Sequence, residues 1–494
     1  MKLNAINAID FYKSGHRVQY PKGTEYVYSN FTPRTGKHCN INGSKGVINF
    51  GLQGFIKWFL KDLWDETFFN QPLDDVRAKY QRRLDNALGK DAVICDHIEA
   101  LHNLGYLPIE IKSLPEGSFV PYGVPAFTIV NTRPEFFWLT NYLESVMSAE
   151  LWRGFTSATT AFAYRQRFMD HSKVTGSPAE FIDWQGHDFS FRGMGGVYDS
   201  MTSGAGHLTS FTGTDSIPAI DYLENYYCAD SDKEMVGGSV PATEHSVMCM
   251  GTLEDEFETF KRLVTETYPG GIISIVSDTW DLWKVLTDYL PRLKDEIMAR
   301  DGRVVIRPDS GDPVDIICGE TLMFGEGTSP SDKGVYELLW DTFGGTINEQ
   351  GYKVLDTHVG AIYGDSITLE RQEEILERLE GKGFCASNLV LGIGSFTYAY
   401  VTRDTHGFAM KATYGVVDGE GREIFKDPIT DDGMKKSAKG MLLVEKVDGE
   451  YTLIDQVTVE EADGGELETV FRNGQLVKET TLSEIRERIN TLLA

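Results

Sequence analysis

The chain has 494 residues, of which 41% are hydrophobic and 12% aromatic, as expected for a globular protein large enough to form more than one domain. Its net charge of −27 would repel nucleic acid and anionic membranes, so an anionic ligand would need a locally basic site. The six cysteines lack zinc-site spacing, no signal peptide is evident and no apolar run approaches the ~18 residues of a membrane span, so we expect a cytoplasmic protein.

The first part of the chain mixes helical and strand patterns. Tyr12 and His16 lie four residues apart, as on one face of a short helical turn. Proline and glycine turns separate two short apolar runs after residue 104, which favours a β-rich layer. The expected strands are 25–31, 109–112 and 127–130, and the expected helical regions are 51–61, a charged region ending at 104, and 136–172.

From about residue 180 the pattern changes to apolar runs that end in polar or glycine-rich loops, several of them followed by a helical stretch. Parallel βα units place such loops together at the carboxyl ends of the strands. Six units predict a central, irregular parallel α/β barrel, and an open doubly wound sheet is the alternative. The runs are 181–184, 208–211, 272–276, 304–306, 360–363 and 389–391, with helices expected at 280–299 and 369–379.

After about residue 397 the pattern returns to β. Asn473-Gly474 between two apolar runs predicts a hairpin, and Ser483 is the expected cap of a closing helix that ends at Leu493. We therefore expect an α/β protein in which the N- and C-terminal segments form one β-rich α+β domain around the barrel. The expected domains are 1–178 with 397–494, and 179–396.

The heptapeptide 307–313 is a candidate site. It follows the apolar run 304–306 and brings Arg307, Asp309 and a glycine turn to the end of that strand. A guanidinium binds phosphate through two hydrogen bonds and a carboxylate accepts from hydroxyls, a combination that suits a sugar phosphate. A surface turn with a salt bridge is the competing interpretation, because Asp/Gly/Pro turns are common.

The other strand-end loops carry carboxylates, basic residues, one aromatic and several glycines. The carboxylates could hold Mg²⁺ or ribose hydroxyls, and the Gly-x-Gly turn could offer N–H groups to a phosphate. A histidine beside a glutamate could serve as nucleophile or base, although a lone histidine is more often structural. Separate salt bridges on each loop are the alternative. These loop residues are His187, Asp188, Phe189, Arg192, Asp215, Glu244, His245, Asp278, Gly364, Asp365, Gly392 and Gly394.

Together, these motifs resemble the nicotinamide phosphoribosyltransferase family of type II phosphoribosyltransferases. The matches are collinear over most of the chain and include His187-Asp188-Phe189, Gly213-Thr214-Asp215, Glu244-His245-Ser246, the heptapeptide and Thr402-Arg403-Asp404. The resemblance implies an enzyme of NAD salvage that makes nicotinamide mononucleotide and pyrophosphate from nicotinamide and phosphoribosyl pyrophosphate. It further implies Mg²⁺, ATP hydrolysis through a phosphohistidine, and a homodimer with shared active sites.

The resemblance also implies which residues bind the base. Phe189 and, from the partner subunit, Tyr12 would stack on the nicotinamide ring. Asp215 would accept from the amide NH₂ and Ser274 would lie near the amide oxygen. Nicotinate would place a carboxylate against Asp215, a costly contact between like charges.

For the sugar, phosphates and ATP the resemblance implies a second set of roles. His245 would carry the phosphoryl group, with Glu244 orienting its ring. The remaining matches are Arg192 and Arg307 near the ring and phosphoribosyl group; Asp278 and Asp309 at the ribose and magnesium pyrophosphate; Gly364, Asp365, Gly392 and Gly394 around the 5′-phosphate and ribose; Arg403 at a phosphate; and Arg34, Lys411, Lys426 and Lys435 from the other subunit or beside the pyrophosphate.

One stretch departs from the family pattern. Gly394-Ser395-Phe396 stands where the animal enzymes have three successive glycines, and the bulk of Phe396 could tighten the phosphate loop. Two other functions stay open: a nicotinate phosphoribosyltransferase, and a non-catalytic ligand-binding protein on the same fold. A sugar-phosphate aldolase barrel is disfavoured, because no central strand ends in the lysine that a Schiff base requires.

Overall fold

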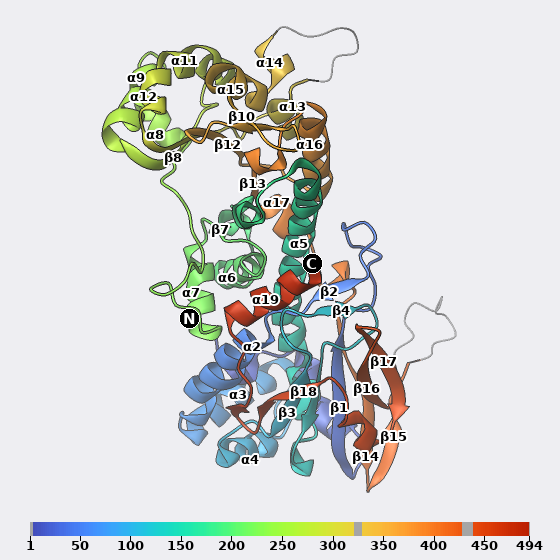
Figure 1. Cartoon of the computed structure of the whole chain (residues 1–494). Helices are drawn as coiled ribbons and strands as arrows, with labels where there is room; N and C mark the ends of the chain where they lie inside the picture. Colours follow the sequence, from blue (N-terminus) through green and yellow to red (C-terminus); the bar gives the residue numbers. More distant parts are fainter. Residues whose placement is uncertain (1–2, 321–328, 427–437, 494) are drawn as a thin grey trace. The chain divides into compact units, whose positions relative to one another are not determined.

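The computed structural model describes residues 3–320, 329–426 and 438–493 (Figure 1). The chain divides into two compact units. The first comprises Met1–Thr159, Tyr222–Ala229 and Val401–Ala494, and the second comprises Thr160–Asp221 and Asp230–Tyr400. The chain therefore leaves the first unit after Thr159, returns to it briefly at Tyr222–Ala229, and returns to it finally at Val401.

A seven-stranded antiparallel sheet, ordered β15-β14-β1-β5-β3-β18-β19, forms the centre of the first unit. The C-terminal strand β14 pairs with β1 along its whole length, so both ends of the chain build one layer. Phe31 of β1 stacks on Phe127 and Phe408 at centroid distances of 5.1 and 5.2 Å, which joins three distant segments in one core. The strands are β1 (Thr24–Thr32), β3 (Ile109–Ser113), β5 (Phe127–Asn131), β14 (Ala409–Val417), β15 (Glu420–Glu423), β18 (Glu468–Arg472) and β19 (Gln475–Leu476).

The helices of this part agree with the predicted pattern. The region expected at 51–61 begins as α2 and continues as a π-helical segment; its first turn is capped by buried Glu116, which accepts from Gly51 N and Gln53 N at 2.9 and 2.7 Å. Helix α5 crosses from the first unit into the second. The segments are α2 (Leu52–Phe55), η3 (Ile56–Leu63), α3 (Leu73–Leu88), α4 (Asp96–Leu104), α5 (Leu139–Thr175) and α19 (Leu482–Leu493), and two strand pairs are β2 (Gly46–Ile48) with β4 (Phe119–Pro121) and β16 (Met441–Val447) with β17 (Glu450–Val457).

The hairpin predicted at Asn473-Gly474 is confirmed, since both residues have positive φ (49° and 79°) between β18 and β19. The predicted cap of the last helix is wrong. Thr481, not Ser483, caps α19: its Oγ1 accepts from Glu484 N at 3.2 Å, while Glu484 Oε2 accepts from Thr481 N at 2.9 Å. This reciprocal pair satisfies two N–H groups at once.

The second unit contains a six-stranded parallel sheet, ordered β7-β6-β13-β12-β9-β8. Four of the six apolar runs predicted as strands are confirmed. The strands are β6 (Gly186–Asp188), β7 (Gly213–Thr214), β8 (Gly270–Val276), β9 (Asp301–Arg307), β12 (Val359–Tyr363) and β13 (Leu389–Ile393).

The other two runs are not strands. Residues 181–184 lie in a 3₁₀ helix, η6 (Ala179–Trp184), and β6 begins at Gly186, where a Cβ would lie only 2.9 Å from the Phe211 ring. Residues 208–211 follow α6 (Val197–His207) and precede β7. Phe211 is buried, and its ring lies 5.1 Å from the His207 ring, measured between centroids. Burial, and not an extended backbone, therefore explains the apolar residues of this run.

The segment from Gly238 to Thr243 bonds to both edges of this sheet. Gly238 N donates to Thr212 O and Gly238 O accepts from Thr214 N, beside β7, each at 2.9 Å. At the other edge, Ser274 N of β8 donates to Pro241 O and Thr243 N donates to Ser274 O, again at 2.9 Å. The two edge strands are thereby linked through one irregular segment.

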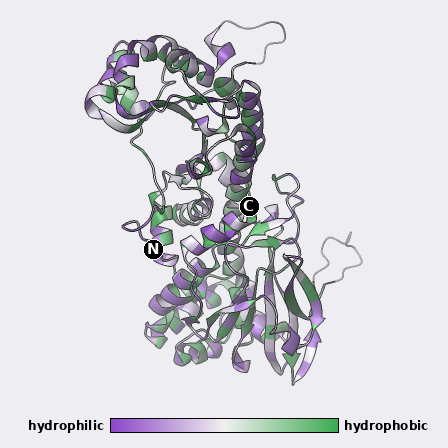
Figure 2. Cartoon of the chain, viewed as in Figure 1, coloured by the Kyte–Doolittle hydropathy of each residue, from purple (hydrophilic) through white to green (hydrophobic). Residues whose placement is uncertain are grey.

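The helices of the second unit follow their strands. The helix expected at 369–379 is α16 (Leu369–Gly381), and the region expected at 280–299 is a broken series: α10 (Leu282–Lys284), η9 (Val285–Tyr289), α11 (Leu290–Arg292) and α12 (Lys294–Met298). Helix α16 carries both hydrophobic and hydrophilic residues (Figure 2), and it buries Leu369, Ile375 and Leu379. No helix in the described part of the chain is both long and apolar enough to cross a membrane. Helix α7 (Ile217–Tyr226) begins in the second unit and ends in the first. The other helices of the second unit are α8 (His245–Met250), α9 (Glu256–Arg262), α13 (Pro313–Cys318), α14 (Pro330–Lys333), α15 (Val335–Phe343) and α17 (Ser395–Tyr398). Strand β10 (Gly345–Ile347) pairs with β11 (Lys353–Leu355).

Candidate active site

The second unit contains a cavity of about 1240 Å³, lined by its parallel strands and by the loops at their carboxyl ends. Ser274, Val305 and Ile362 form part of its wall, and Arg303 and Asn388 lie toward the amino ends of β9 and β13. The loop residues that line it include His187, Asp188, Phe189, Arg192, Asp215, Glu244, His245, Arg307, Asp309, Gly364, Asp365 and Gly394.

On one side of the cavity a carboxylate is held by two donors. His187 Nε2 donates to Asp215 Oδ1 at 2.9 Å, and Ser239 Oγ donates to the same oxygen at 2.6 Å. Burial raises the pKa of Asp215. The hydrogen bonds from His187 and Ser239 and the charge of Arg307 lower it by more than burial raises it, so the pKa lies below the ordinary value. Asp215 is therefore an ionised acceptor at neutral pH.

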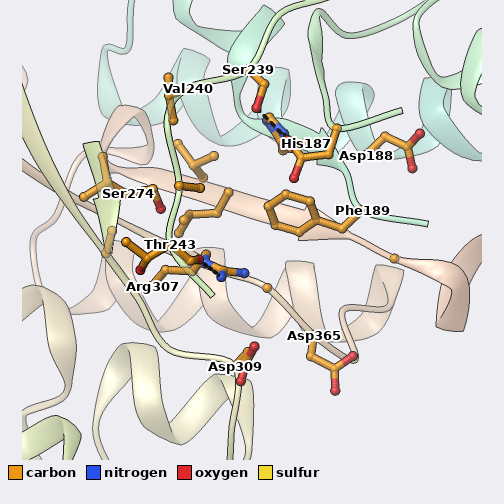
Figure 3. Close-up of a pocket in the computed structure, with 18 of the residues that line it drawn as sticks. His187, Asp188, Phe189, Ser239, Val240, Thr243, Ser274, Arg307, Asp309 and Asp365 are labelled. Atoms are coloured by element: carbon orange, nitrogen blue, oxygen red, sulfur yellow. Dashed lines mark hydrogen bonds and ion pairs between the residues drawn. The ribbon is translucent and has the colours of Figure 1, made fainter. Parts of the chain in front are cut away.

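The Phe189 ring lies in the middle of the site, with His187 and Ser239 on one side and Arg307 on the other (Figure 3). The rings of Phe189 and His187 are 4.7 Å apart. Gly392 of β13 permits this position, because a Cβ there would lie 2.3 Å from Phe189 Cδ2. Asp188 points away from the Phe189 ring in Figure 3, and its Oδ1 accepts from Ser190 N at 2.9 Å.

The heptapeptide forms a turn at the end of β9. Gly311 has φ +91°, which favours glycine, and Asp312 caps α13 by accepting from Val314 N at 2.9 Å. Arg307 Nη2 donates to Thr243 O at 2.6 Å, while its buried Nε has no hydrogen-bond partner among the described residues. The guanidinium is thus tethered at one nitrogen beside the cavity.

Three potential metal ligands converge beside this turn. Atoms of His245, Asp278 and Asp309 lie within 4.8 Å of one another. Asp278 Oδ2 accepts from Asp309 N and Ser310 N at 2.9 and 2.7 Å, which ties the ends of β8 and β9 together. Its buried Oδ1 has no hydrogen-bond partner among the described residues. Two carboxylates, one with an unused oxygen, suit a hard divalent cation.

The sequence matches two family descriptions. The nicotinate phosphoribosyltransferase (NAPRTase) family matches residues 184–475, and the nicotinamide phosphoribosyltransferase N-terminal domain matches residues 4–111. A nicotinamide phosphoribosyltransferase of Acinetobacter baylyi is 56% identical over 496 residues, which cover 99% of this chain and 97% of that protein. The chain belongs to the nicotinamide phosphoribosyltransferase family. The resemblance read from the motifs is thereby confirmed.

More distantly related proteins are members of the same family or share the fold. The nicotinamide phosphoribosyltransferase of Xanthomonas campestris pv. campestris is 33% identical over 494 residues, which cover 98% of this chain and 97% of that protein. Crystal structures of nicotinate-nucleotide pyrophosphorylase from Pyrococcus furiosus and of human nicotinic acid phosphoribosyltransferase share the fold, with TM-scores of 0.55 and 0.53 at 14% identity. They cover 99% and 98% of this chain, and it covers 95% and 93% of theirs.

Most of the residues that the family resemblance selected lie together in the second unit. Gly392 does not line the cavity but supports the Phe189 ring, and Asp278 supports the turn that carries Asp309. The following belong to the first unit, and none lines the cavity: Tyr12, Arg34, Arg403, Lys411 and Lys426. Lys435 lies outside the described residues.

The first-unit residues have partners of their own. Tyr12 is 59% exposed and meets His16 edge-on at 4.9 Å, while Arg34 Nε donates to Gly407 O at 2.8 Å. Arg403 pairs with Asp404 at 3.2 Å, and Lys411 and Lys426 are exposed on and beside the antiparallel sheet. Tyr12, Arg403 and the two lysines thus keep surface that another molecule can reach.

The expected role of Glu244, which is to orient the His245 ring, stays a prediction. Its carboxylate accepts from Ser246 Oγ, whereas the two His245 nitrogens lie 3.1 Å from Thr279 Oγ1 and from Asp309 Oδ1. Sequence reasoning missed Thr279 and Thr243 because their contacts join loops that are distant in the chain. Ser239 was visible in the motif before Pro241, but its bond to Asp215 appears only after folding.

Proposed function

We propose that this chain transfers the phosphoribosyl group of phosphoribosyl pyrophosphate to nicotinamide, forming nicotinamide mononucleotide and pyrophosphate in NAD salvage. The observation that carries the proposal is 56% identity to a nicotinamide phosphoribosyltransferase over 99% of the chain, together with an ionised Asp215 inside the cavity. The active site is the cavity of the second unit, and the sheet with its bridging segment forms an irregular barrel around it.

The base binds beside Phe189, with its amide directed toward Asp215 and Ser274. Asp215 accepts from the amide NH₂, and His187 and Ser239 keep that carboxylate oriented by bonding its Oδ1. A nicotinate carboxylate in the same place would face a like charge, so nicotinamide is the preferred base.

The sugar and its phosphates bind at the strand-end loops. Arg192 and Arg307 contact the phosphoribosyl group, and Gly364, Asp365 and Gly394 surround the ribose and 5′-phosphate. Asp309 and Asp278 would hold Mg²⁺, which would supply positive charge to offset that of the pyrophosphate. The side chains near the anomeric carbon stabilise positive charge that develops as the bond to pyrophosphate breaks, and the ring nitrogen of nicotinamide forms the new bond.

ATP is the co-substrate, and His245 carries the phosphoryl group. The histidine is 45% exposed, so a nucleotide can reach it, and it lies beside the carboxylates of the proposed magnesium site. This arrangement allows phosphorylation to alter binding at the site where pyrophosphate leaves.

We also propose a cytoplasmic homodimer. Tyr12 would complete the partner subunit's site and Arg403 would bind a phosphate. Four basic residues would come from the other subunit or flank the pyrophosphate: Arg34, Lys411, Lys426 and Lys435. The domains of each chain would be 1–178 with 397–494, and 179–396. The exposure of Tyr12 supports this, because an aromatic ring at the surface gains most when a partner covers it.

One competition assay tests the function. The purified chain is given phosphoribosyl pyrophosphate, Mg²⁺ and equal concentrations of nicotinamide and nicotinate, with and without ATP, and both mononucleotides are quantified. We expect nicotinamide mononucleotide to predominate. Preferential use of nicotinate would establish the sister activity instead, and folded protein that makes neither product would indicate a non-catalytic binding protein.

A further inference from the structure

The imidazole of His245 is held from both sides. Its Nδ1 lies 3.1 Å from Thr279 Oγ1, and its Nε2 lies 3.1 Å from Asp309 Oδ1. Thr279 directly follows Asp278, whose carboxylate binds the turn that carries Asp309. The two groups that flank the ring therefore come from two loops that are fastened to each other.

The chemistry of the two partners fixes the tautomer of the ring. An ionised carboxylate can only accept, so Nε2 carries the hydrogen that is donated to Asp309. In the neutral ring Nδ1 then holds the lone pair, and the hydroxyl of Thr279 donates to it. A hydroxyl is suited to this task because it can donate here and rotate away when the ring changes state.

Other groups do little to orient the ring. His245 is the first residue of the short helix α8, and its side chain is 45% exposed, so packing constrains it weakly. The neighbouring Glu244 is engaged with Ser246. Asp278 Oδ1 lies 3.9 Å from Nε2, beyond hydrogen-bond distance.

We propose that Thr279 is a positioning residue for His245, holding the imidazole in its Nε2–H tautomer so that Nδ1 keeps its lone pair. When the Thr279 hydroxyl rotates away, Nδ1 attacks the terminal phosphorus of ATP, the N–P bond forms, and ADP leaves. The inference rests on the proposed function, since it concerns the histidine that ATP phosphorylates. It assigns to Thr279 the orienting role that the sequence had suggested for Glu244.

The test compares Thr279→Val, which keeps the shape and removes the hydroxyl, with Thr279→Ser, which keeps the hydroxyl. Thr287→Val is the matched control, because the exposed Thr287 hydroxyl donates to Trp283 O of its own helix at 2.7 Å, away from the cavity. Nitrogen-15 NMR of histidine-labelled full-length protein reports the His245 tautomer, with His245→Ala used to assign the signal. Radiolabelled ATP reports the rate of phosphoenzyme formation.

We expect Thr279→Val to mix the two tautomers and to slow phosphoenzyme formation about 2- to 10-fold, the effect of losing one neutral hydrogen bond. ATP-independent turnover should fall less than phosphorylation does. Thr279→Ser should restore both readouts, and Thr287→Val should match the wild type. If phosphoenzyme formation slowed as much in Thr279→Ser as in Thr279→Val, the role of Thr279 would be purely structural and the proposal would be overturned.

The two proposals fail separately. If the wild type forms no phosphoenzyme with ATP, the ATP-coupled part of the proposed function is wrong, and the NMR measurement alone decides the role of Thr279. An unchanged His245 tautomer in Thr279→Val overturns the positioning role, whatever the activity of the wild type.

Discussion

Asp215 Oδ1 accepts hydrogen bonds from both His187 Nε2, at 2.9 Å, and Ser239 Oγ, at 2.6 Å. The three residues come from different strand-end segments that converge on one side of the cavity. A carboxylate with both donors on one oxygen is oriented, and its other oxygen is available to a ligand.

Asp215→Asn should weaken the preference for nicotinamide. The substitution removes the charge that repels nicotinate, and it adds an NH₂ that can donate to a carboxylate. We expect the ratio of kcat/KM for the two bases to shrink at least about 10-fold, measured by separate initial rates. Asp288→Asn, on an exposed helix, is the control. An unchanged ratio would remove Asp215 from base selection.

Gly392→Ala should disturb base binding without touching the base directly. The new methyl group would lie 2.3 Å from the Phe189 ring and displace it. We expect the KM for nicotinamide to rise about 10-fold, with an overpacking cost of about 1–3 kcal/mol in unfolding free energy. Gly381→Ala, which has open space around its Cβ, is the control. An unaltered KM would mean that the ring position does not determine base affinity.

His245→Ala should abolish ATP coupling while leaving some ATP-independent turnover, because the ring nitrogen of nicotinamide attacks the sugar directly. The measurement is label transfer from ATP to protein, together with product formed per ATP hydrolysed. His358→Ala removes another histidine paired with an aspartate, Asp356, that does not line the cavity. Undiminished labelling of His245→Ala would contradict the assignment.

A shared active site predicts complementation between two inactive variants. In a heterodimer of Tyr12→Ala with Asp309→Ala, one site carries both substitutions and the other carries neither. Random exchange should then restore about one quarter of the wild-type activity, because half of the dimers have one intact site. Asp278→Ala mixed with Asp309→Ala should show no recovery, since both residues belong to one unit. Verified exchange without recovery would argue against sharing.

The unfolding free energy should fall as the pH drops from about 6.5 to about 4. Burial lowers the pKa of His97, His207 and His406 to about 4 from an ordinary 6.5. Between these values the unfolded chain binds protons that the folded chain does not, so acid favours unfolding, and stability is regained as the pH rises to 6.5. Each histidine could cost on the order of 3 kcal/mol at the acid limit.

Urea titrations at pH 7.5, 6 and 5 measure this slope. His406→Asn keeps an acceptor for the Tyr122 hydroxyl, which lies 2.8 Å from His406 Nδ1, and should make the slope shallower. His38→Asn, at an exposed position, is the control. The same steep slope in His406→Asn would exclude that histidine as a source.

The sequence by itself determined most of the local structure. Short strand-like runs, two of them set off by proline and glycine turns, predicted β1, β3 and β5, and Asn473-Gly474 predicted its hairpin, because residue pattern and turn chemistry are local properties. Buried runs predicted β8, β9, β12 and β13. The family motifs identified the loops of the candidate site, since short motifs such as the heptapeptide at 307–313 match the family residue by residue and in the same order.

Tertiary structure decided the rest. The run at 208–211 is apolar because it is buried, and burial does not distinguish an extended from a helical backbone. The run at 181–184 lies in a 3₁₀ helix that buries only Ile182 and leaves Trp184 exposed. Contacts between distant loops decide three features of the site. They are the linkage of the sheet edges by the segment from Gly238 to Thr243, the hydrogen bond from His187 to Asp215, and the position of Thr279 beside the His245 ring. A hydrogen bond between side chains far apart in sequence has no local pattern, so only the folded chain reveals which group orients which.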